Sequence, residues 1–227
     1  MTTFVFLQVG EDPNANLMVQ SINITNPNAR IIQCSDERTK KIEGVSDIFR
    51  LDKDFADIMA FRTEAFSKLM LTEPAIYLDT DMLVLNEIFA NKLLQDSEVA
   101  LCERSFHRDL LINTPFRTMD LSEYSNKTLA EVYPILGCFT VTKSYKFWAS
   151  CLDNLLTLDK KFHRWYGDQE ALRNIALRGE FIVSYLPESL VACLPEFIQK
   201  NAPPICIHFK GAERKDLMRR YFAEIYK

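Results

Sequence analysis

Short apolar runs alternate along the chain with longer segments whose apolar residues recur at helical spacing. The short runs are typical of buried strands and the longer segments of amphipathic helices. The runs predict strands at residues 2–10, 29–36, 45–52, 75–79, 97–104, 133–144, 180–187 and 203–209. The longer segments predict helices at residues 12–22, 54–71, 145–162, 167–179 and 213–226. The alternation predicts a single α/β domain over residues 1–227, with a central, mostly parallel sheet flanked by helices.

Residues 105–130 interrupt this alternation, because they show no clear hydrophobic period. A segment of that length without predicted secondary structure is uncommon in a compact domain and often serves as a lid or a binding loop. We therefore expect residues 105–130 to form an insertion or a mobile loop that could order over a bound ligand.

Composition and charge narrow the possible partners. The net charge of −4 and the isoelectric point near 5.5 argue against a large nucleic-acid surface, which needs clustered positive charge. No apolar run approaches the roughly 18 residues of a membrane span, and the first residues are expected to form a strand rather than a signal peptide. The six cysteines are spaced 13 or more residues apart and are interpreted as reduced thiols of a cytoplasmic protein, for which a homo-oligomer stays possible.

The predicted sheet offers a place for a ligand, since open α/β sheets bind ligands at the carboxyl ends of their strands. Four of the six glycines lie at a strand end or beside a polar motif: Gly10, Gly137, Gly167 and Gly211. The chain has neither the G-x-G-x-x-G of dinucleotide-binding folds nor the G-x-x-x-x-G-K-[ST] of a P-loop. The candidate site therefore has to be built from other polar residues.

Two aspartates, Asp79 and Asp81, interrupt the apolar stretch AIYLDTDMLVL at residues 75–85. In an extended chain they share a face and lie roughly 6–7 Å apart. Ionised carboxylates are costly to bury unless they are paired or bind a cation. Carboxylate oxygens, together with substrate phosphates, suit Mg²⁺ or Mn²⁺. The pair therefore indicates a metal site, and the structural alternative is a turn that leaves the strand.

Arg62 is unexpected on the predicted helix 54–71, for which Asp52 or Asp54 is the expected N-cap. The apolar residues of that helix form one stripe: Phe55, Ile58, Met59, Phe66, Leu69 and Met70. Arg62 falls within the stripe, and a guanidinium there needs an anionic partner. Either it holds a phosphate or carboxylate of a ligand, or it forms a structural salt bridge with an internal acid such as Asp79.

Two later motifs also have two explanations each. Asp168, Gln169 and Glu170 lie in the first turn of the predicted helix 167–179. Carboxylates there either cap the helix and complement its dipole, which is a sufficient structural explanation, or belong to a functional site. His208 ends a buried strand shortly before a glycine, and a histidine there is either part of a structural hydrogen bond or a ligand.

Taken in order, R-x(16)-D-T-D at 62–81, G-D-Q at 167–169 and H-x-x-G-x-x-R at 208–214 resemble the motifs of GT-A-fold nucleotide-sugar glycosyltransferases. The set is most similar to glycosyltransferase family 8, the group of glycogenin, galactinol synthase and bacterial lipopolysaccharide galactosyl- and glucosyltransferases. The resemblance covers nearly the whole chain. It implies a Rossmann-like GT-A domain that moves a hexose from a nucleotide sugar, with UDP as the expected nucleotide, to an unknown acceptor with retention of configuration.

The resemblance also implies roles for the matching residues. The matches to the family's Mn²⁺ or Mg²⁺ ligands are Asp79, Asp81 and His208. The matches to its donor-binding positions are Gln8, Arg62, Asp79, Gly211 and Arg214. Asp168 matches the acid that holds donor-sugar hydroxyls, and Gln169 matches the residue at the reactive face of the sugar.

The chain departs from the family pattern at two places. Ile135 stands where family members usually carry the asparagine of an N-x-G motif. Arg214 replaces the lysine of the terminal motif, and Lys215 and Asp216 follow where Pro-Trp is usual. An arginine can still hold a diphosphate, so the departures indicate a divergent subfamily.

Two other functions compete with the transferase. A haloacid-dehalogenase-type phosphatase also places D-x-D after a strand, but usually after the first strand and with Thr or Val where this chain has Leu83. The other is a non-catalytic module of the same fold that binds a nucleotide sugar without turning it over, an alternative suggested by Ile135.

Overall fold

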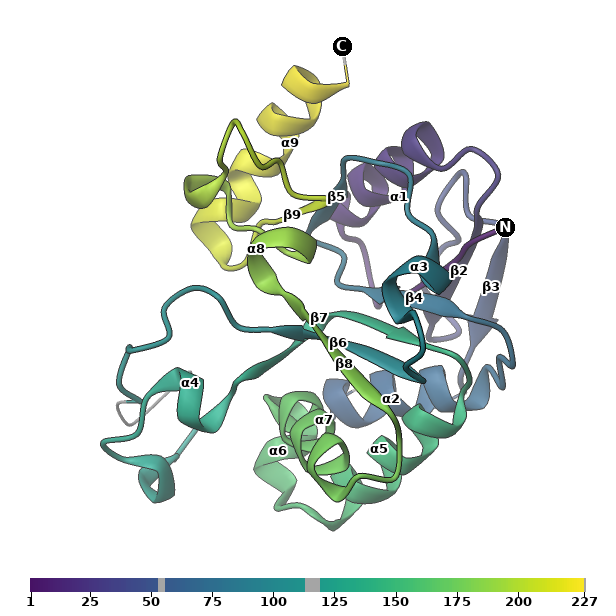
Figure 1. The fold of residues 1–227 in the computed structure, drawn as a ribbon. Helices are drawn as coiled ribbons and strands as arrows, with labels where there is room; N and C mark the ends of the chain where they lie inside the picture. Colours follow the sequence, from purple (N-terminus) through teal and green to yellow (C-terminus); the bar gives the residue numbers. More distant parts are fainter. Residues whose placement is uncertain (53–55, 113–118, 227) are drawn as a thin grey trace.

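The computed structural model describes residues 1–52, 56–112 and 119–226, and it confirms the predicted α/β architecture (Figure 1). The central seven-stranded sheet has the order β3-β2-β1-β4-β7-β6-β8. The bounds are Thr3–Leu7 (β1), Arg30–Ser35 (β2), Asp47–Arg50 (β3), Ala75–Leu78 (β4), Val99–Glu103 (β6), Ile135–Thr142 (β7) and Val183–Pro187 (β8). Strand β7 runs antiparallel to β4 and β6, and the other neighbouring pairs are parallel, so the sheet is mostly parallel as predicted.

Apolar side chains on both faces of the sheet pack against helices, which form one layer on each face. In β1, Phe4 and Phe6 belong to one core and Val5 to the other, because successive side chains of a strand point to opposite faces. The first core is covered by α1 (Pro13–Thr25), α3 (Ala90–Leu94) and α9 (Ala212–Ile225). The second is covered by α2 (Ile58–Lys68), α5 (Lys146–Thr157), α6 (Lys160–Arg164) and α7 (Gly167–Arg178), which Figure 1 shows together below the sheet.

A second, two-stranded sheet joins β5 (Met82–Val84) to β9 (Cys206–His208) in antiparallel pairing. The apolar stretch 75–85 is therefore two strands of different sheets, and the turn that connects them contains Asp79 and Asp81. Met82 pairs with His208, and the Phe209 N–H donates to the Asp81 carbonyl at 2.8 Å. This long-range pairing brings the histidine beside the two aspartates.

Two predicted helices differ from the observed ones. Helix α2 begins at Ile58 with Asp57 as its N-cap, so the prediction of Asp52 or Asp54 was wrong in position, and Asp54 itself lies outside the described residues, as does Phe55. Met70 is 63% exposed, with φ of 50°, and so does not belong to the buried stripe. The buried residues of α2 are Phe61, Thr63, Ala65 and Phe66.

The predicted helix 145–162 is two helices, α5 and α6. The chain leaves helical geometry at Leu158, and the Asp159 carboxylate accepts from the Lys161 N–H at 2.9 Å, which begins α6. A local cap thus competes successfully with continuation of one helix.

The segment between β6 and β7 contains a 3₁₀ turn (Ser122–Tyr124) and α4 (Leu129–Val132), and residues 113–118 lie outside the described residues. Its described parts extend away from the sheet (Figure 1). The mobility expected for 105–130 stays a prediction. The remaining short elements are α8 (Glu188–Val191) and a 3₁₀ turn (Pro195–Phe197). Among the described residues, no helix is long and apolar enough to cross a membrane.

Candidate active site

A cavity of about 660 Å³ lies where β1 and β4 end, β7 begins and the chain leaves β9. Its position agrees with the expectation that a ligand binds at the carboxyl ends of the parallel strands. Eight of the nine residues predicted for the site line it: Gln8, Arg62, Asp79, Asp81, Asp168, Gln169, His208 and Gly211. Residues from α2, α7 and β9 and from the connections that follow β1, β4 and β9 therefore converge on one cavity.

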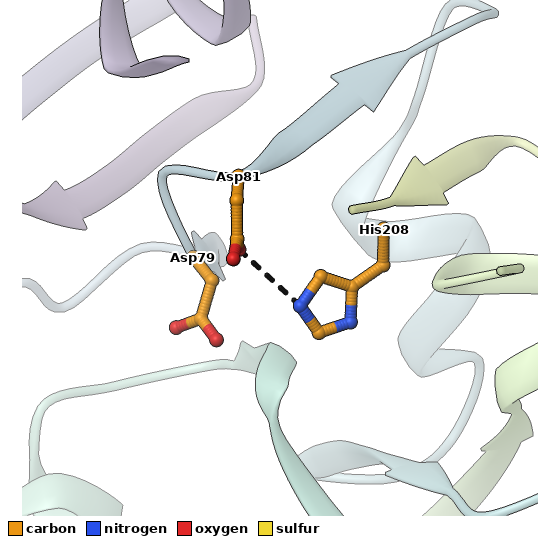
Figure 2. Close-up of side chains that lie close together, drawn as sticks. All are labelled: Asp79, Asp81 and His208. Atoms are coloured by element: carbon orange, nitrogen blue, oxygen red, sulfur yellow. Dashed lines mark ion pairs between the residues drawn. The ribbon is translucent and has the colours of Figure 1, made fainter. Parts of the chain in front are cut away.

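Asp79, Asp81 and His208 form a cluster of possible metal ligands (Figure 2). One ligand atom from each residue lies within 4.8 Å of the others. The turn after β4 places the two carboxylates, and β9 places the imidazole, whose Nε2 lies 3.2 Å from Asp81 Oδ1. Asp81 and His208 are buried, at 7% and 3% exposure.

The charges in this cluster are strongly coupled. Burial would raise the pKa of Asp81, but His208 and Lys215 hold it well below its usual range. Burial raises the pKa of Asp79, the nearby Asp81 carboxylate adds to this effect, and Arg62 opposes it. Negative charge at one buried and one partly buried carboxylate is the electrostatic environment that favours a cation.

Arg62 connects two carboxylates across the cavity. Its Nη1 lies 2.6 Å from Asp79 Oδ1, and its Nη2 lies 3.1 Å from Asp168 Oδ2 and donates to the Gly137 carbonyl at 2.5 Å. Burial would lower the pKa of Arg62, but the two carboxylates raise it, so the guanidinium stays charged. The structural alternative, a salt bridge with Asp79, is thus present, and the same arginine faces the cavity.

Gly137 makes this arrangement sterically possible. A Cβ built at Gly137 would lie 2.2 Å from Asp168 Oδ2 and 2.9 Å from Arg62 Nη2. The absence of a side chain at this point of β7 therefore lets the carboxylate and the guanidinium approach the strand.

The first turn of α7 brings Asp168 and Gln169 into the cavity wall. The helix starts after Tyr166, which has a left-handed φ of 59°, and the Asp168 carboxylate is directed to Arg62. Among the described residues, Gln8 Oε1 and Gln169 Oε1 are buried without a hydrogen-bond partner. Most buried polar atoms in proteins are hydrogen-bonded, and a ligand in this cavity could supply the partner of these two amide oxygens.

Arg214 is the predicted residue that lies outside the cavity wall. Its Nε lies 3.0 Å from Glu196 Oε2, and its Nη1 donates to the Lys210 carbonyl at 3.0 Å. The neighbouring Lys215 lines the cavity instead, with Nζ 3.2 Å from Asp81 Oδ2. The sequence showed both cations, but only the rotation of α9 decides which one faces the aspartates.

Asp12 is a cavity residue that sequence reasoning missed. Its Oδ1 caps α1 by accepting from the Asn14 N–H at 2.9 Å, and its Oδ2 accepts from the Thr80 hydroxyl at 2.8 Å. The D-P that starts a helix signals the cap. Nothing in the sequence signals the second bond, which ties the Asp79–Asp81 turn to the start of α1.

Comparisons with known proteins bear on the fold. No protein-family model matches the chain, and no curated protein matches it. The structure is similar to an active-site mutant of LgtC, with a TM-score of 0.55 and 14% identity over 99% of this chain and 95% of LgtC. It is also similar to the glycosyltransferase GlyE of Streptococcus pneumoniae TIGR4 (TM-score 0.59, 12% identity, 99% of this chain, 62% of GlyE). The bifunctional glycosyltransferase WbbM gives a TM-score of 0.60 and 13% identity over 99% of this chain and 51% of WbbM. The chain has the GT-A fold.

Within the GT-A fold, the donor atoms present fit a hard divalent cation. Two carboxylates supply the oxygen ligands that Mg²⁺ and Mn²⁺ favour, and the imidazole supplies a nitrogen ligand that suits Mn²⁺ better than Mg²⁺. One ligand atom of each residue lies within 4.8 Å of the other two, so the three residues are close enough to hold one cation.

Proposed function

We propose that the protein is a divalent-metal-dependent glycosyltransferase that moves a hexose from a nucleotide sugar, with UDP as the expected nucleotide, to a hydroxyl acceptor with retention of configuration. The observation that carries the proposal is the convergence of Asp79, Asp81 and His208 in one cavity of a chain with the GT-A fold. LgtC, a galactosyltransferase of similar structure, was solved with donor and acceptor sugar analogs.

The proposed transfer requires stabilisation of the negative charge that develops on the leaving diphosphate. The bond between the anomeric carbon and the diphosphate oxygen breaks, and its electron pair leaves with the nucleoside diphosphate. The acceptor hydroxyl oxygen bonds to the same carbon, and its proton passes to the departing diphosphate. A cation held by Asp79, Asp81 and His208 would supply Lewis-acid stabilisation of the leaving phosphate, which contributes several kcal/mol in such sites.

The chain's own residues orient the sugar. Asp168 and Arg62 form a rigid charged pair whose remaining carboxylate and guanidinium positions can hydrogen-bond sugar hydroxyls. The Gln169 amide is uncharged and would donate or accept a hydrogen bond at the reactive face. Gln8, at the end of β1, would contact the nucleotide through its amide. The oxocarbenium-like character of such reactions suits the carboxylate-rich wall.

The direct test combines Mn²⁺, a nucleoside diphosphate and thermal unfolding. We expect UDP with Mn²⁺ to raise the melting temperature, and the Asp81→Ala variant to lose this rise. Asp153→Ala, which removes an exposed carboxylate of α5 remote from the cavity, is the matched control and should keep it. Failure of every nucleoside diphosphate to stabilise the protein would refute the proposal.

A panel of nucleotide sugars separates the proposal from the two alternatives. A transferase should release nucleoside diphosphate from one donor, slowly with water and faster with its acceptor. A non-catalytic module would bind the donor and release nothing. A phosphatase would hydrolyse a generic phosphomonoester and lose that activity in Asp79→Asn.

A further inference from the structure

Asp81 carries a basic side chain at each of its two carboxylate oxygens. His208 Nε2 lies 3.2 Å from Oδ1, and Lys215 Nζ lies 3.2 Å from Oδ2. The Asp81 side chain is only 11% exposed, so few other partners can reach it. A cation bound by Asp81 and His208 must therefore compete with the ammonium of Lys215 for the same carboxylate.

Lys215 and Arg62, the two cations on the aspartates, differ in their freedom to move. The Arg62 side chain is 12% exposed and is fixed by Asp79, Asp168 and the Gly137 carbonyl. The Lys215 side chain is 42% exposed and extends from the first turn of α9 to Asp81. A half-exposed lysine on a flexible four-carbon stem can change partner at little cost, whereas the largely buried guanidinium with three partners cannot.

A divalent cation and its phosphate ligands would reverse the electrostatics around Lys215. A cation on Asp81 repels the ammonium, since like charges at this separation are unfavourable in a partly buried site. A diphosphate bound to the same cation brings several acceptor oxygens and negative charge to the cavity. The favoured partner of Lys215 then changes from carboxylate to phosphate.

We propose that Lys215 is an internal counter-ion of Asp81 that a divalent cation displaces and that then binds the donor's diphosphate. This inference rests on the proposed function. It has a specific consequence: the lysine weakens binding of the cation alone and strengthens binding of the nucleotide once the cation is present. The two ligands are thus coupled through Lys215, and by linkage each raises the affinity for the other.

Binding measurements on the full chain test this without reference to turnover. Free Mn²⁺ is followed by electron paramagnetic resonance without nucleotide, and UDP binding is followed by calorimetry at saturating Mn²⁺. The variants are Lys215→Met, which keeps length but removes charge, Lys215→Arg, which keeps the charge, and Arg219→Met. Arg219 is an exposed cation one helical turn further along α9, so its variant controls for the loss of one charge.

We expect Lys215→Met to bind Mn²⁺ alone about twofold to fivefold more tightly, the range for loss of a half-exposed ion pair. The same variant should bind UDP with Mn²⁺ about tenfold or more weakly, as for loss of a charged hydrogen bond. Lys215→Arg should retain most of the wild-type behaviour, and Arg219→Met should match wild type in both measurements.

The outcomes separate this inference from the proposed function. If wild type binds neither Mn²⁺ nor UDP, both are refuted. If wild type binds both and Lys215→Met behaves like Arg219→Met, or loses affinity for Mn²⁺ alone, only the counter-ion role is refuted. If Arg214→Met rather than Lys215→Met weakens UDP binding, the role belongs to Arg214 and the inference is wrong.

Discussion

At the scale of single residues, the candidate site contains ion pairs in which removal of one partner would leave a largely buried charge uncompensated and destabilise the fold. Arg62 is the shared partner of Asp79 and Asp168, and Gly137 supplies the space in which they meet. The sequence identified Arg62 because a guanidinium on an apolar helix face needs an anion. It could not identify which anion, since Asp79 and Asp168 are 89 residues apart in the chain and meet only through the fold.

Replacing Arg62 with methionine should destabilise the protein by about 3 kcal/mol at pH 7, because it leaves two carboxylates of a largely buried cluster without their cation. The pKa of Asp79 is raised by burial, and loss of Arg62 raises it further. An aspartate whose pKa is higher folded than unfolded costs stability above that pKa, and the cost disappears as acid protonates it.

Urea unfolding of wild type and Arg62→Met in the presence of a chelator, from pH 7 to about pH 4, measures this effect. The stability difference should narrow towards the acid end. A difference that is constant with pH would show that lost packing of the arginine stem, and not uncompensated charge, is responsible.

Gly137→Ala should cost about 1–3 kcal/mol, the usual range for overpacking, because the new methyl group overlaps Asp168 and Arg62. Urea unfolding measures the cost. In the double variant Gly137→Ala/Asp168→Ala the nearest clashing atom is gone, so the added cost of the alanine should be smaller than in wild type. Equal costs in both backgrounds would contradict the clash.

At the scale of elements, the sequence predicted the sheet and most helices because their periodicity is local. It predicted a strand at residues 75–79 but missed β5, because that three-residue strand depends on pairing with the distant β9. It also predicted one helix where α5 and α6 form, because the break depends on the local cap by Asp159 and the apolar spacing continues across it. Contacts distant in sequence, such as Thr80 to Asp12, carry no periodic signal.

Thr80→Val tests whether that contact holds the aspartate turn. Loss of the hydroxyl removes a hydrogen bond to Asp12 and should cost about 1 kcal/mol in urea unfolding. Because the turn between β4 and β5 carries both carboxylates, Mn²⁺ affinity should also fall severalfold, as when supporting hydrogen bonds of metal ligands are removed. Thr80→Ser keeps the hydroxyl and should retain Mn²⁺ affinity. Normal Mn²⁺ binding by Thr80→Val would show that the turn is fixed by other contacts.

At the scale of the whole molecule, the cavity joins parts of the chain that belong to different sheets. The aspartates follow the central sheet, whereas His208 and Lys215 belong to β9 and the following helix α9. The resemblance carried by the order of the motifs implied this convergence, whereas the rule for strand ends did not, because β9 lies outside the central sheet. The order of motifs did not predict which of the Arg214 and Lys215 side chains faces the aspartates. Their directions depend on how α9 packs through Met218 against the first core.

A ligand that bridges Asp79, Asp81 and His208 should therefore stabilise the C-terminal elements more than the far side of the sheet. At one hundred times its dissociation constant such a ligand adds about 2.7 kcal/mol to global stability. Hydrogen exchange measured with and without Mn²⁺ and UDP should show the largest added protection in β9, the start of α9 and the 79–82 turn. The backbone amides of α5 serve as the internal reference. This helix contains the buried Trp148 of the second core and contributes no residue to the cavity wall. Protection that rises equally in α5 and β9 would indicate only a global shift, and would contradict a ligand held between the two sheets.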